Sequence, residues 1–346
     1  MSLAGVATGI GSLPGDDARA AAALVLDSVP DLPHVPELPD RGPWAQLAGR
    51  AAAVLVDLPA QWEGSAWRVS MRPGRDVRRA KALLSEDLDA VEDRFQGYHG
   101  LAKLQMCGPL TLAAVLELRG GTAMISDASA VADLAASLAE GLSEHLRDLR
   151  RRVPGAEWVV QVDEPALSSV TKGTIPRASG WGAIAAVESA EAGRVLGSLT
   201  SPLIEDAVAV AIHSCATDPD WGVLTGGGHA ERRAISVDLE VIDVAAAAPA
   251  MEEWLGAGGS LWFGVDPLAG GVEGEDPALD KLEAARSVLG IAPDDVATRI
   301  AITPSCGISG SADVARASYA GVQRLMRRLR GDDPQERSEG YERGSR

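Results

Sequence analysis

The chain has 346 residues, of which 46% are hydrophobic and 23% are charged, and its mean hydropathy is +0.03. This length allows one large domain or two medium ones, and the composition is that of an average soluble protein. The formal charge is −17, so the chain lacks the basic excess with which proteins bind nucleic acid or anionic membranes. No apolar run approaches the roughly 20 residues of a membrane helix, and the N-terminus lacks the basic and apolar regions of a signal peptide.

Eight short apolar or β-branched segments recur along the chain, each ending in small, polar or turn residues. They are residues 5–11, 31–38, 102–108, 158–163, 208–215, 234–239, 260–266 and 299–306. Between them lie stretches with apolar residues at helical spacing, most clearly at 17–26, 127–152 and 312–329. A strand followed by a helix, eight times over, predicts an α/β fold, namely a single-domain (β/α)8 TIM barrel over residues 1–330.

Two regions depart from this alternation. Segment 61–75, with the sequence QWEGSAWRVSMRPGR, lies in the long gap between the second and third predicted strands. We expect it to form a long loop over the mouth of the barrel, because long loops in compact domains are usually functional. Residues 331–346 are polar and contain Gly and Pro, so we expect a disordered tail there.

Polar residues collect at the ends of the predicted strands, which is where a barrel of this type carries its active site. All three cysteines, Cys107, Cys215 and Cys306, lie at such ends. Three cysteines are too few for a disulfide scaffold, and without an export signal they predict a reducing, cytoplasmic location. For Cys107 we favour the alternative that a buried cysteine merely fills space.

His213 and Cys215 are two residues apart on one predicted strand, so their side chains share a face. An imidazole and a thiolate on one face form the beginning of a zinc site, and Cys306 is placed to supply a third ligand. Asp238 ends the sixth strand and is the natural fourth or exchangeable ligand. Sulfur and nitrogen ligands favour Zn²⁺ over Mg²⁺ or Mn²⁺, and three fixed ligands with one weak position are typical of catalytic zinc.

A second group of strand ends suits an amino acid. Glu37 ends the second strand and Asp163 the fourth, and two carboxylates at the mouth suit an ammonium group. We favour Asp163 over the acid that follows it, since adjacent strand residues point to opposite faces. Ser12 and the backbone of Ile10 and Gly11 can receive a carboxylate, because a glycine-rich strand end exposes N–H groups. Helix capping or a loop hydrogen bond is the alternative role for either acid.

These residues resemble those of the cobalamin-independent methionine synthases, specifically their C-terminal catalytic barrel. The matching motifs are TGIGSLP at 8–14, H-x-P-E at 34–37, CGPLTL at 107–112, VQVDEPAL at 160–167, H-S-C at 213–215 and PSCGI at 304–308. The resemblance covers nearly the whole chain and implies zinc-dependent transfer of a methyl group to homocysteine, which gives methionine. It implies zinc ligation by His213, Cys215, Cys306 and Asp238, the last in place of the family's Glu. It also implies homocysteine contacts from Ile10, Gly11, Ser12, Glu37 and Asp163.

The half of the family's site that binds folate is not matched. Full-length members have a second, N-terminal barrel that helps to bind folate, and this chain is too short to contain it. Val115 stands where the family has a Trp that stacks on folate, and Ser169 stands where it has a Glu. The family's proton-donating His is absent, which leaves Asp266 as the nearest candidate for a catalytic residue. The chain therefore resembles short, single-barrel relatives, some of which are thought to use another methyl donor.

Three functions stay open at this point. The first is a zinc-dependent methyltransferase that acts on homocysteine. The second keeps the zinc but uses another thiol or a non-folate donor, such as a methyl group on a corrinoid or corrinoid protein. The third is a thiol- or metal-binding protein that kept the fold without catalysis. In each case we expect small-molecule partners and no contact with nucleic acid or membranes.

Overall fold

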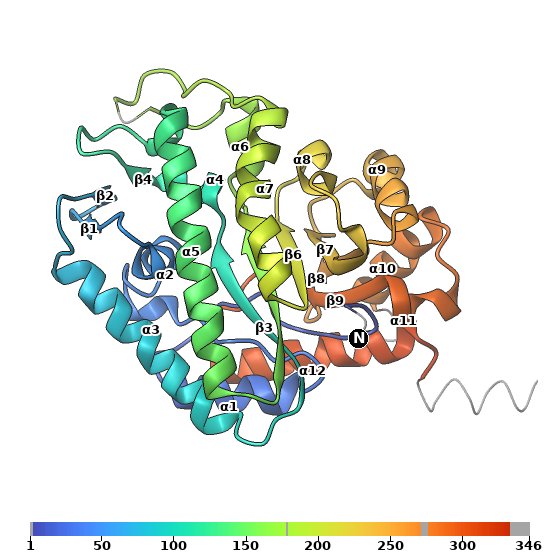
Figure 1. Cartoon of the computed structure of the whole chain (residues 1–346). Coiled ribbons are helices and arrows are strands. Elements are labelled where there is room, and N and C mark those ends of the chain that lie inside the picture. The colour runs from blue at the N-terminus through green and yellow to red at the C-terminus, as the bar shows by residue number, and fades with distance from the viewer. Residues whose placement is uncertain (1–2, 178, 271–275, 333–346) are drawn as a thin grey trace, which may run out of the picture.

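The computed structural model describes residues 3–177, 179–270 and 276–332 (Figure 1). A curled parallel sheet of six strands forms its centre, in the order β3-β5-β6-β7-β8-β9. The strands are β3 (Gly100–Cys107), β5 (Ala156–Asp163), β6 (Ala209–Ser214), β7 (Arg233–Asp238), β8 (Ser260–Val265) and β9 (Ile300–Pro304). These correspond to the last six predicted strands and are buried on both faces, as parallel strands covered by helices are.

The first two predicted strands are extended segments that make isolated bridges. Residues 5–11 meet β9 through the bridge between Ala7 and Ile302, and residues 31–38 meet β3 through the bridge between His34 and Lys103. A further bridge, between Ser12 and Glu37, joins the two segments to each other. The prediction of eight regular strands is therefore confirmed only in part: six form a regular sheet, and two segments lie along its edges.

The physical reason for this irregularity lies in the composition of the two segments. Residues 31–38 read DLPHVPEL, and Pro33 and Pro36 have no N–H group to donate to a neighbouring strand. Residues 5–11 read GVATGIG, and glycines weaken a strand because they lose more backbone freedom when it forms. Each segment therefore pairs at isolated points.

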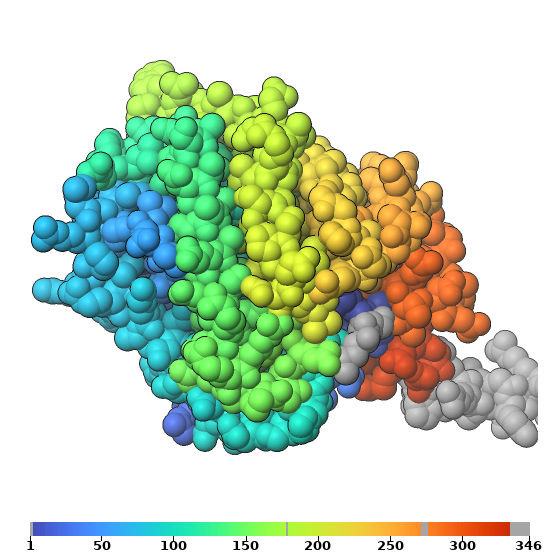
Figure 2. Space-filling model, viewed as in Figure 1, coloured from blue at the N-terminus to red at the C-terminus, as the bar shows by residue number. Residues whose placement is uncertain are grey.

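Helices surround the sheet (Figure 1). They are α1 (Ala18–Ser28), α2 (Leu47–Val54), α3 (Arg75–Arg94), α4 (Pro109–Val115), α5 (Ala128–Arg152), α6 (Leu167–Lys172), α7 (Ser189–Asp206), α8 (Trp221–Thr225), α9 (Val244–Gly256), α10 (Pro277–Val288), α11 (Val296–Arg299) and α12 (Ala312–Leu329). The three clearest predicted helices are confirmed as α1, α5 and α12. Asp17 and Asp127 cap the first two, each accepting hydrogen bonds from two backbone N–H groups of the first turn. In Figure 2, α5 (green) and α7 (yellow-green) stand side by side on the face of the molecule that is turned to the viewer.

The prediction of a loop at 61–75 is wrong for part of the segment. Strand β1 (Ala60–Trp62) and strand β2 (Trp67–Val69) form an antiparallel hairpin, and β2 pairs with the short strand β4 (Leu116–Glu117). The indole rings of Trp62 and Trp67 pack edge to face, with centroids 6.1 Å apart. Cross-strand aromatic pairs of this kind stabilise a hairpin, which explains why the segment is ordered.

Helix α12 ends at Leu329, and residues 333–346, which make up most of the predicted tail, lie outside the described residues. None of the helices that the structure describes combines the length and the apolar character needed to cross a bilayer.

The inner face of the sheet changes character along the strands. Near the amino ends, Trp262 is fully buried among small and apolar side chains, and its indole N–H donates to the carbonyl of Leu3 at 2.8 Å. Towards the carboxyl ends, the buried inner residues are polar, as at Gln161 and Asp163 on β5 and His213 on β6. Apolar side chains therefore fill the interior at the amino ends of the strands, and polar side chains lie in the interior at their carboxyl ends.

Candidate functional site

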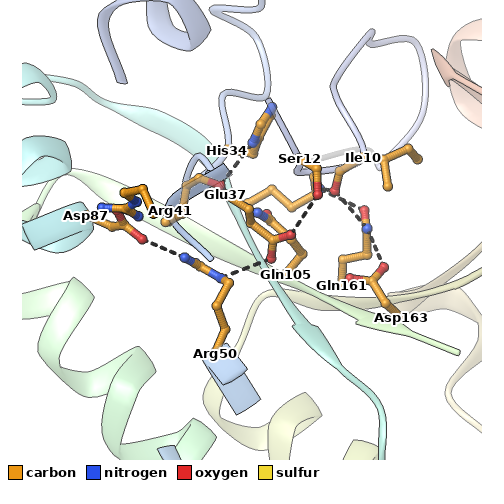
Figure 3. A network of polar contacts seen from close by, with 12 residues as sticks. Ile10, Ser12, His34, Glu37, Arg41, Arg50, Asp87, Gln105, Gln161 and Asp163 are labelled. Carbon is orange, nitrogen blue, oxygen red and sulfur yellow. Dashed lines mark hydrogen bonds and ion pairs between the residues drawn. The ribbon is translucent and has the colours of Figure 1, made fainter. Parts of the chain in front are cut away.

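Ser12 and Glu37 are the first pair of predicted site residues to meet. The Ser12 hydroxyl donates to Glu37 Oε2 at 3.2 Å, and the Glu37 N–H donates to the carbonyl of Gly11 at 3.1 Å (Figure 3). A Cβ atom on Gly11 would lie 2.8 Å from the side chain of Gln105, so only glycine allows this approach. The two extended segments are thus locked together at the carboxyl end of the sheet.

Gln161 connects this pair to Asp163. Its Nε2 group donates to the carbonyl of Ile10 at 2.9 Å and to Asp163 Oδ1 at 2.7 Å. Lys103 donates from Nζ to the same Ile10 carbonyl at 2.9 Å and to Gln161 Oε1 at 2.7 Å. The five residues predicted to contact an amino acid therefore lie in one network (Figure 3), which we call the amino-acid group: Ile10, Gly11, Ser12, Glu37 and Asp163. Their role as substrate contacts stays a prediction.

Glu37 also faces a buried cation. Arg50, on α2, lies with its Nε 3.2 Å from Glu37 Oε1 and its Nη1 2.5 Å from Asp87 Oδ2. Arg41 pairs with the other oxygen of Asp87. Burial works to lower the pKa of Arg50, but the charges of Glu37 and Asp87 outweigh it and raise that pKa. Both carboxylates are therefore neutralised by arginines with little access to solvent.

The remaining charges of the amino-acid group are shifted by burial. Burial, followed by the charge of Glu37, raises the pKa of Asp163 well above its usual range, while Lys103 and Gln161 act in the opposite direction. Burial lowers the pKa of Lys103 to about 7, against the charges of Asp163 and Glu37. Asp163 and Lys103 thus depend on each other to be charged at neutral pH.

Glu164 faces away from this group, as the alternation along β5 predicts. Its carboxylate accepts hydrogen bonds from the N–H groups of Leu110 and Thr111 at 2.9 and 2.7 Å, and from the Thr111 hydroxyl at 2.6 Å. These donors belong to the first turn of α4, whose N-cap, Gly108, has no side chain to offer. Glu164 thus caps the first turn of α4, a role that the sequence analysis did not assign to it.

Two of the predicted zinc ligands meet at the carboxyl ends of β6 and β9. Cys215 is half-buried and Cys306 is exposed, and neither forms a disulfide. Their thiols share a hydrogen bond, which lowers the pKa of Cys306 to about 6 and raises that of Cys215. One of the two sulfurs is therefore a thiolate near neutral pH, and the charge of Asp238 acts on both. We call Cys215 and Cys306 the sulfur pair.

His213 points to the inner face of the sheet, with its Nδ1 3.0 Å from the Ser236 hydroxyl. Burial, with a smaller contribution from Lys103, lowers its pKa to about 4, so the imidazole is neutral. Asp238 is buried, and its Oδ1 accepts the N–H of Glu240 at 2.9 Å. Within the part of the chain that the structure describes, no three side chains of His, Cys, Asp or Glu converge as ligands of one metal ion. The four-ligand zinc site thus stays a prediction.

Two further predicted residues have local roles. Asp266 is exposed directly after β8, and its Oδ1 accepts the N–H of Leu268 at 3.0 Å. Its proposed catalytic role stays a prediction. Cys107 is 1% exposed, and burial raises its pKa well above the usual range, which agrees with the role of filling space in the core.

The sulfur pair and the amino-acid group are neighbours through the loop after β9. A Cβ atom on Gly307, next to Cys306, would lie 2.7 Å from the Cβ of Ser12. The N–H of Ile308 donates to the carbonyl of Ser12 at 2.8 Å. The two predicted parts of the site therefore share one edge of the sheet.

Sequence reasoning missed the polar residues inside the strands. Lys103 and Gln105 on β3, and Gln161 on β5, are fully buried within otherwise apolar strands. The sequence pattern that indicates them is a polar residue at every second position of a strand. Such residues share one face, as Lys103, Gln105 and Cys107 do on β3 and Gln161 and Asp163 do on β5. Polar residues that alternate within a buried strand indicate a polar interior.

Two sizeable cavities lie elsewhere. One, of about 880 Å³, lies between α5, α7 and the segment before α7, and another, of about 930 Å³, lies between α2, α3 and α5. Neither is lined by the amino-acid group or the sulfur pair. The candidate site therefore coincides with neither of these two cavities, and it is identified from the positions of its side chains.

No protein-family model matches the chain, and a comparison with curated proteins finds no match. Among solved structures, the chain is similar to a B12-independent methionine synthase from Shewanella sp. W3-18-1 in complex with selenomethionine. The TM-score is 0.46 and the identity 14%, over 77% of this chain and 71% of that chain. It is also similar to a glycoside hydrolase family 5 enzyme from Prevotella bryantii B14, with a TM-score of 0.40 and 10% identity, over 94% and 93% of the two chains. Similarities this weak carry no argument about function. Fold and site together define an α/β protein with a polar group at the carboxyl edge of a curled parallel sheet.

Proposed function

We propose that this chain is a zinc-dependent methyltransferase that moves a methyl group to a thiol, and that homocysteine is the acceptor and methionine the product. The observation that carries the proposal is the contact between the Cys215 and Cys306 thiols at the edge of the sheet that also holds the amino-acid group. A sulfur-binding metal beside paired carboxylates suits a substrate that is both a thiol and an amino acid.

The chemistry of the donor set fits zinc. The sulfur pair includes one thiol that ionises near neutral pH, and the imidazole of His213 is neutral, as a metal ligand must be. The tautomer in which Nδ1–H donates to the Ser236 hydroxyl would leave the lone pair of His213 on Nε2, which is the usual arrangement for a ligating histidine. We propose that His213, Cys215 and Cys306 hold zinc, with Asp238 as the exchangeable ligand. When bound, zinc would lower the pKa of the acceptor thiol so that it is a thiolate at neutral pH.

The chain's own residues hold the other end of the acceptor. Glu37 and Asp163 are proposed to bind its ammonium group, and the Ser12 hydroxyl with the backbone at Ile10 and Gly11 to bind its carboxylate. The reaction replaces the S–H bond with an S–CH3 bond, so that a proton leaves the thiol and the donor keeps the electron pair of its broken bond to carbon. Asp266, directly after β8, is our candidate for the acid that serves the donor's side.

The donor is the open part of the proposal. Val115 is 46% exposed and Ser169 is half-buried, and neither offers the aromatic ring or the carboxylate that a folate would be expected to use there. We therefore propose a corrinoid or other non-folate methyl donor as the alternative to folate. A cytoplasmic location stays our expectation, because thiols that must bind a metal need a reducing compartment.

The test measures zinc content and methionine formation in the zinc-loaded chain, with methyl-folate and methyl-cobalamin assayed side by side. Cys215→Ser and Cys306→Ser should each lower zinc affinity at least about tenfold and abolish methyl transfer, since outer-shell changes alone cost this much. Cys107→Ala, which alters the third cysteine, should keep both and serves as the matched control. A Cys215→Ser variant with full zinc content and full activity would overturn the proposal. Tight homocysteine binding without transfer from any donor would instead identify a non-catalytic thiol-binding protein.

A further inference from the structure

Lys103 is a buried lysine in the middle of β3. Its side chain is fully buried and makes two hydrogen bonds, to the carbonyl of Ile10 at 2.9 Å and to Gln161 Oε1 at 2.7 Å. Burial of an ammonium group costs several kcal/mol unless nearby charges and hydrogen bonds offset it. A lysine in this place therefore calls for a role that an apolar residue could not fill.

The hydrogen bonds of Lys103 fix the orientation of the Gln161 amide. Because Lys103 can only donate, it requires the oxygen of Gln161 on its side. The Gln161 NH2 group is then left to face Ile10 and Asp163 Oδ1, at 2.9 and 2.7 Å. Without Lys103, the amide could turn and present its oxygen to the carboxylate. Lys103 thereby determines that Asp163 faces the NH2 group of Gln161 and not its amide oxygen.

The charges around Lys103 point to the same role. The acids that face it are Asp163 on β5 and Glu37, and it also acts on the imidazoles of His34 and His213, which are both neutral. Glu37 already has a cation in Arg50, at 3.2 Å. Lys103 is thus the buried cation left to balance Asp163, with the Gln161 amide bonded to both.

We propose that Lys103 is a positioning residue that, through Gln161, holds Asp163 as the carboxylate that recognises the α-ammonium group of the acceptor. This inference rests on the proposed function and deepens it, because it makes Lys103 a determinant of specificity for thiols that carry an amino group. If Lys103 is replaced by an apolar residue, nothing holds the Gln161 oxygen on the side away from Asp163. The amide is then free to turn, and Asp163 Oδ1 loses the N–H donor that fixes its position for an incoming ammonium group.

The experiment compares two thiols on the zinc-loaded full-length chain by titration calorimetry. These are homocysteine and 4-mercaptobutyrate, which is homocysteine without its amino group. Lys103→Met is expected to weaken homocysteine binding roughly 10- to 100-fold, the size of a lost hydrogen bond between charged groups. Binding of 4-mercaptobutyrate should change by less than about twofold, because a group that only recognises ammonium contributes nothing to it.

Two further variants make the result decisive. Gln161→Leu keeps the lysine but removes its link to Asp163 and should show the same selective loss, which keeps the test available if Lys103→Met fails to fold. Lys172→Met makes the same substitution at an exposed lysine that pairs with Asp218, and it should leave both affinities unchanged. An equal loss for the two thiols would mean a merely structural role and would overturn the inference, as would unchanged homocysteine binding in Lys103→Met or, where that variant does not fold, in Gln161→Leu. If the unaltered chain binds neither thiol, the proposed function itself fails; if it binds homocysteine and Lys103→Met does so equally, only the role of Lys103 fails.

Discussion

Replacement of Glu164 by Gln tests how burial and hydrogen bonding compete at the start of α4. The side chain is fully buried and accepts three hydrogen bonds from Leu110 and Thr111. Burial nevertheless raises its pKa from 4.5 to about 7, with the three hydrogen bonds acting the other way. Because the pKa is higher in the folded chain than in the unfolded chain, the folded state binds the proton more tightly. The resulting stability is fully present below about pH 4.5 and is lost as the pH rises through about 7.

The size of the effect follows from the two pKa values. A rise from 4.5 to about 7 corresponds to about 3 kcal/mol in total, of which about 2.5 kcal/mol separates pH 5 from pH 8. The variant Glu164→Gln has no such titration. The difference in free energy of unfolding between the unaltered chain and this variant should therefore be about 2–3 kcal/mol larger at pH 5 than at pH 8.

The assay is urea unfolding at the two pH values, followed by tryptophan fluorescence. The buried histidines have pKa values of about 3 to 4 in the folded chain and titrate between pH 5 and pH 8 only when the chain unfolds, and this contribution is common to both proteins and cancels in the comparison. An equal difference at pH 5 and pH 8, or a larger one at pH 8, would refute the reasoning. Either result would mean that Glu164 stays ionised throughout and that its three hydrogen bonds outweigh its burial.

Two stability predictions concern the other buried networks. Arg50→Met leaves the carboxylates of Glu37 and Asp87 without the cation that they share. In urea unfolding, this variant should lower the free energy of unfolding by about 3–5 kcal/mol. A loss below about 1 kcal/mol would contradict a stabilising role for these ion pairs. Tyr319→Phe removes the hydroxyl that lies 2.7 Å from Nε2 of the buried His34. It should lower the free energy of unfolding by about 1–3 kcal/mol, which calorimetry would record as a lower Tm. An unchanged Tm would show that His34 finds another partner.

Much of the fold was predictable because its signals are local. Each of the six regular strands is a mainly apolar run that ends in a polar or small residue or is followed directly by one, and the helices after Asp17 and Asp127 begin with the residue type that best satisfies free N–H groups. The inward orientation of Asp163, as opposed to Glu164, followed from alternation alone, whereas its role as a substrate contact stays a prediction. These inferences need only a few neighbouring residues, and that is why they succeeded.

The interior of the site could not be derived in the same way. Lys103 meets Ile10 and Gln161, which are 93 and 58 residues away along the chain. Arg50 reaches Glu37 from a helix whose sequence gives no sign of a buried ion pair. A single sequence carries no information about such distant pairings, so the counter-ions of the predicted carboxylates became visible only in three dimensions.

The irregularity of the first two predicted strands coincides with close contacts at the candidate site. Gly11 lies against the side chain of Gln105, and Gly307 lies against Ser12, at distances that leave no room for a Cβ atom. Pro36 directly precedes Glu37 and has no N–H group with which to pair with a neighbouring strand. Next to it, the Glu37 carboxylate contacts Ser12 and Arg50. The same glycines and prolines that interrupt the hydrogen-bonded ladder therefore bring the amino-acid group against the loop that carries Cys306. Local departures from a regular pattern are expected to collect where function requires close contact, and here they do so at the proposed meeting point of thiol and amino acid.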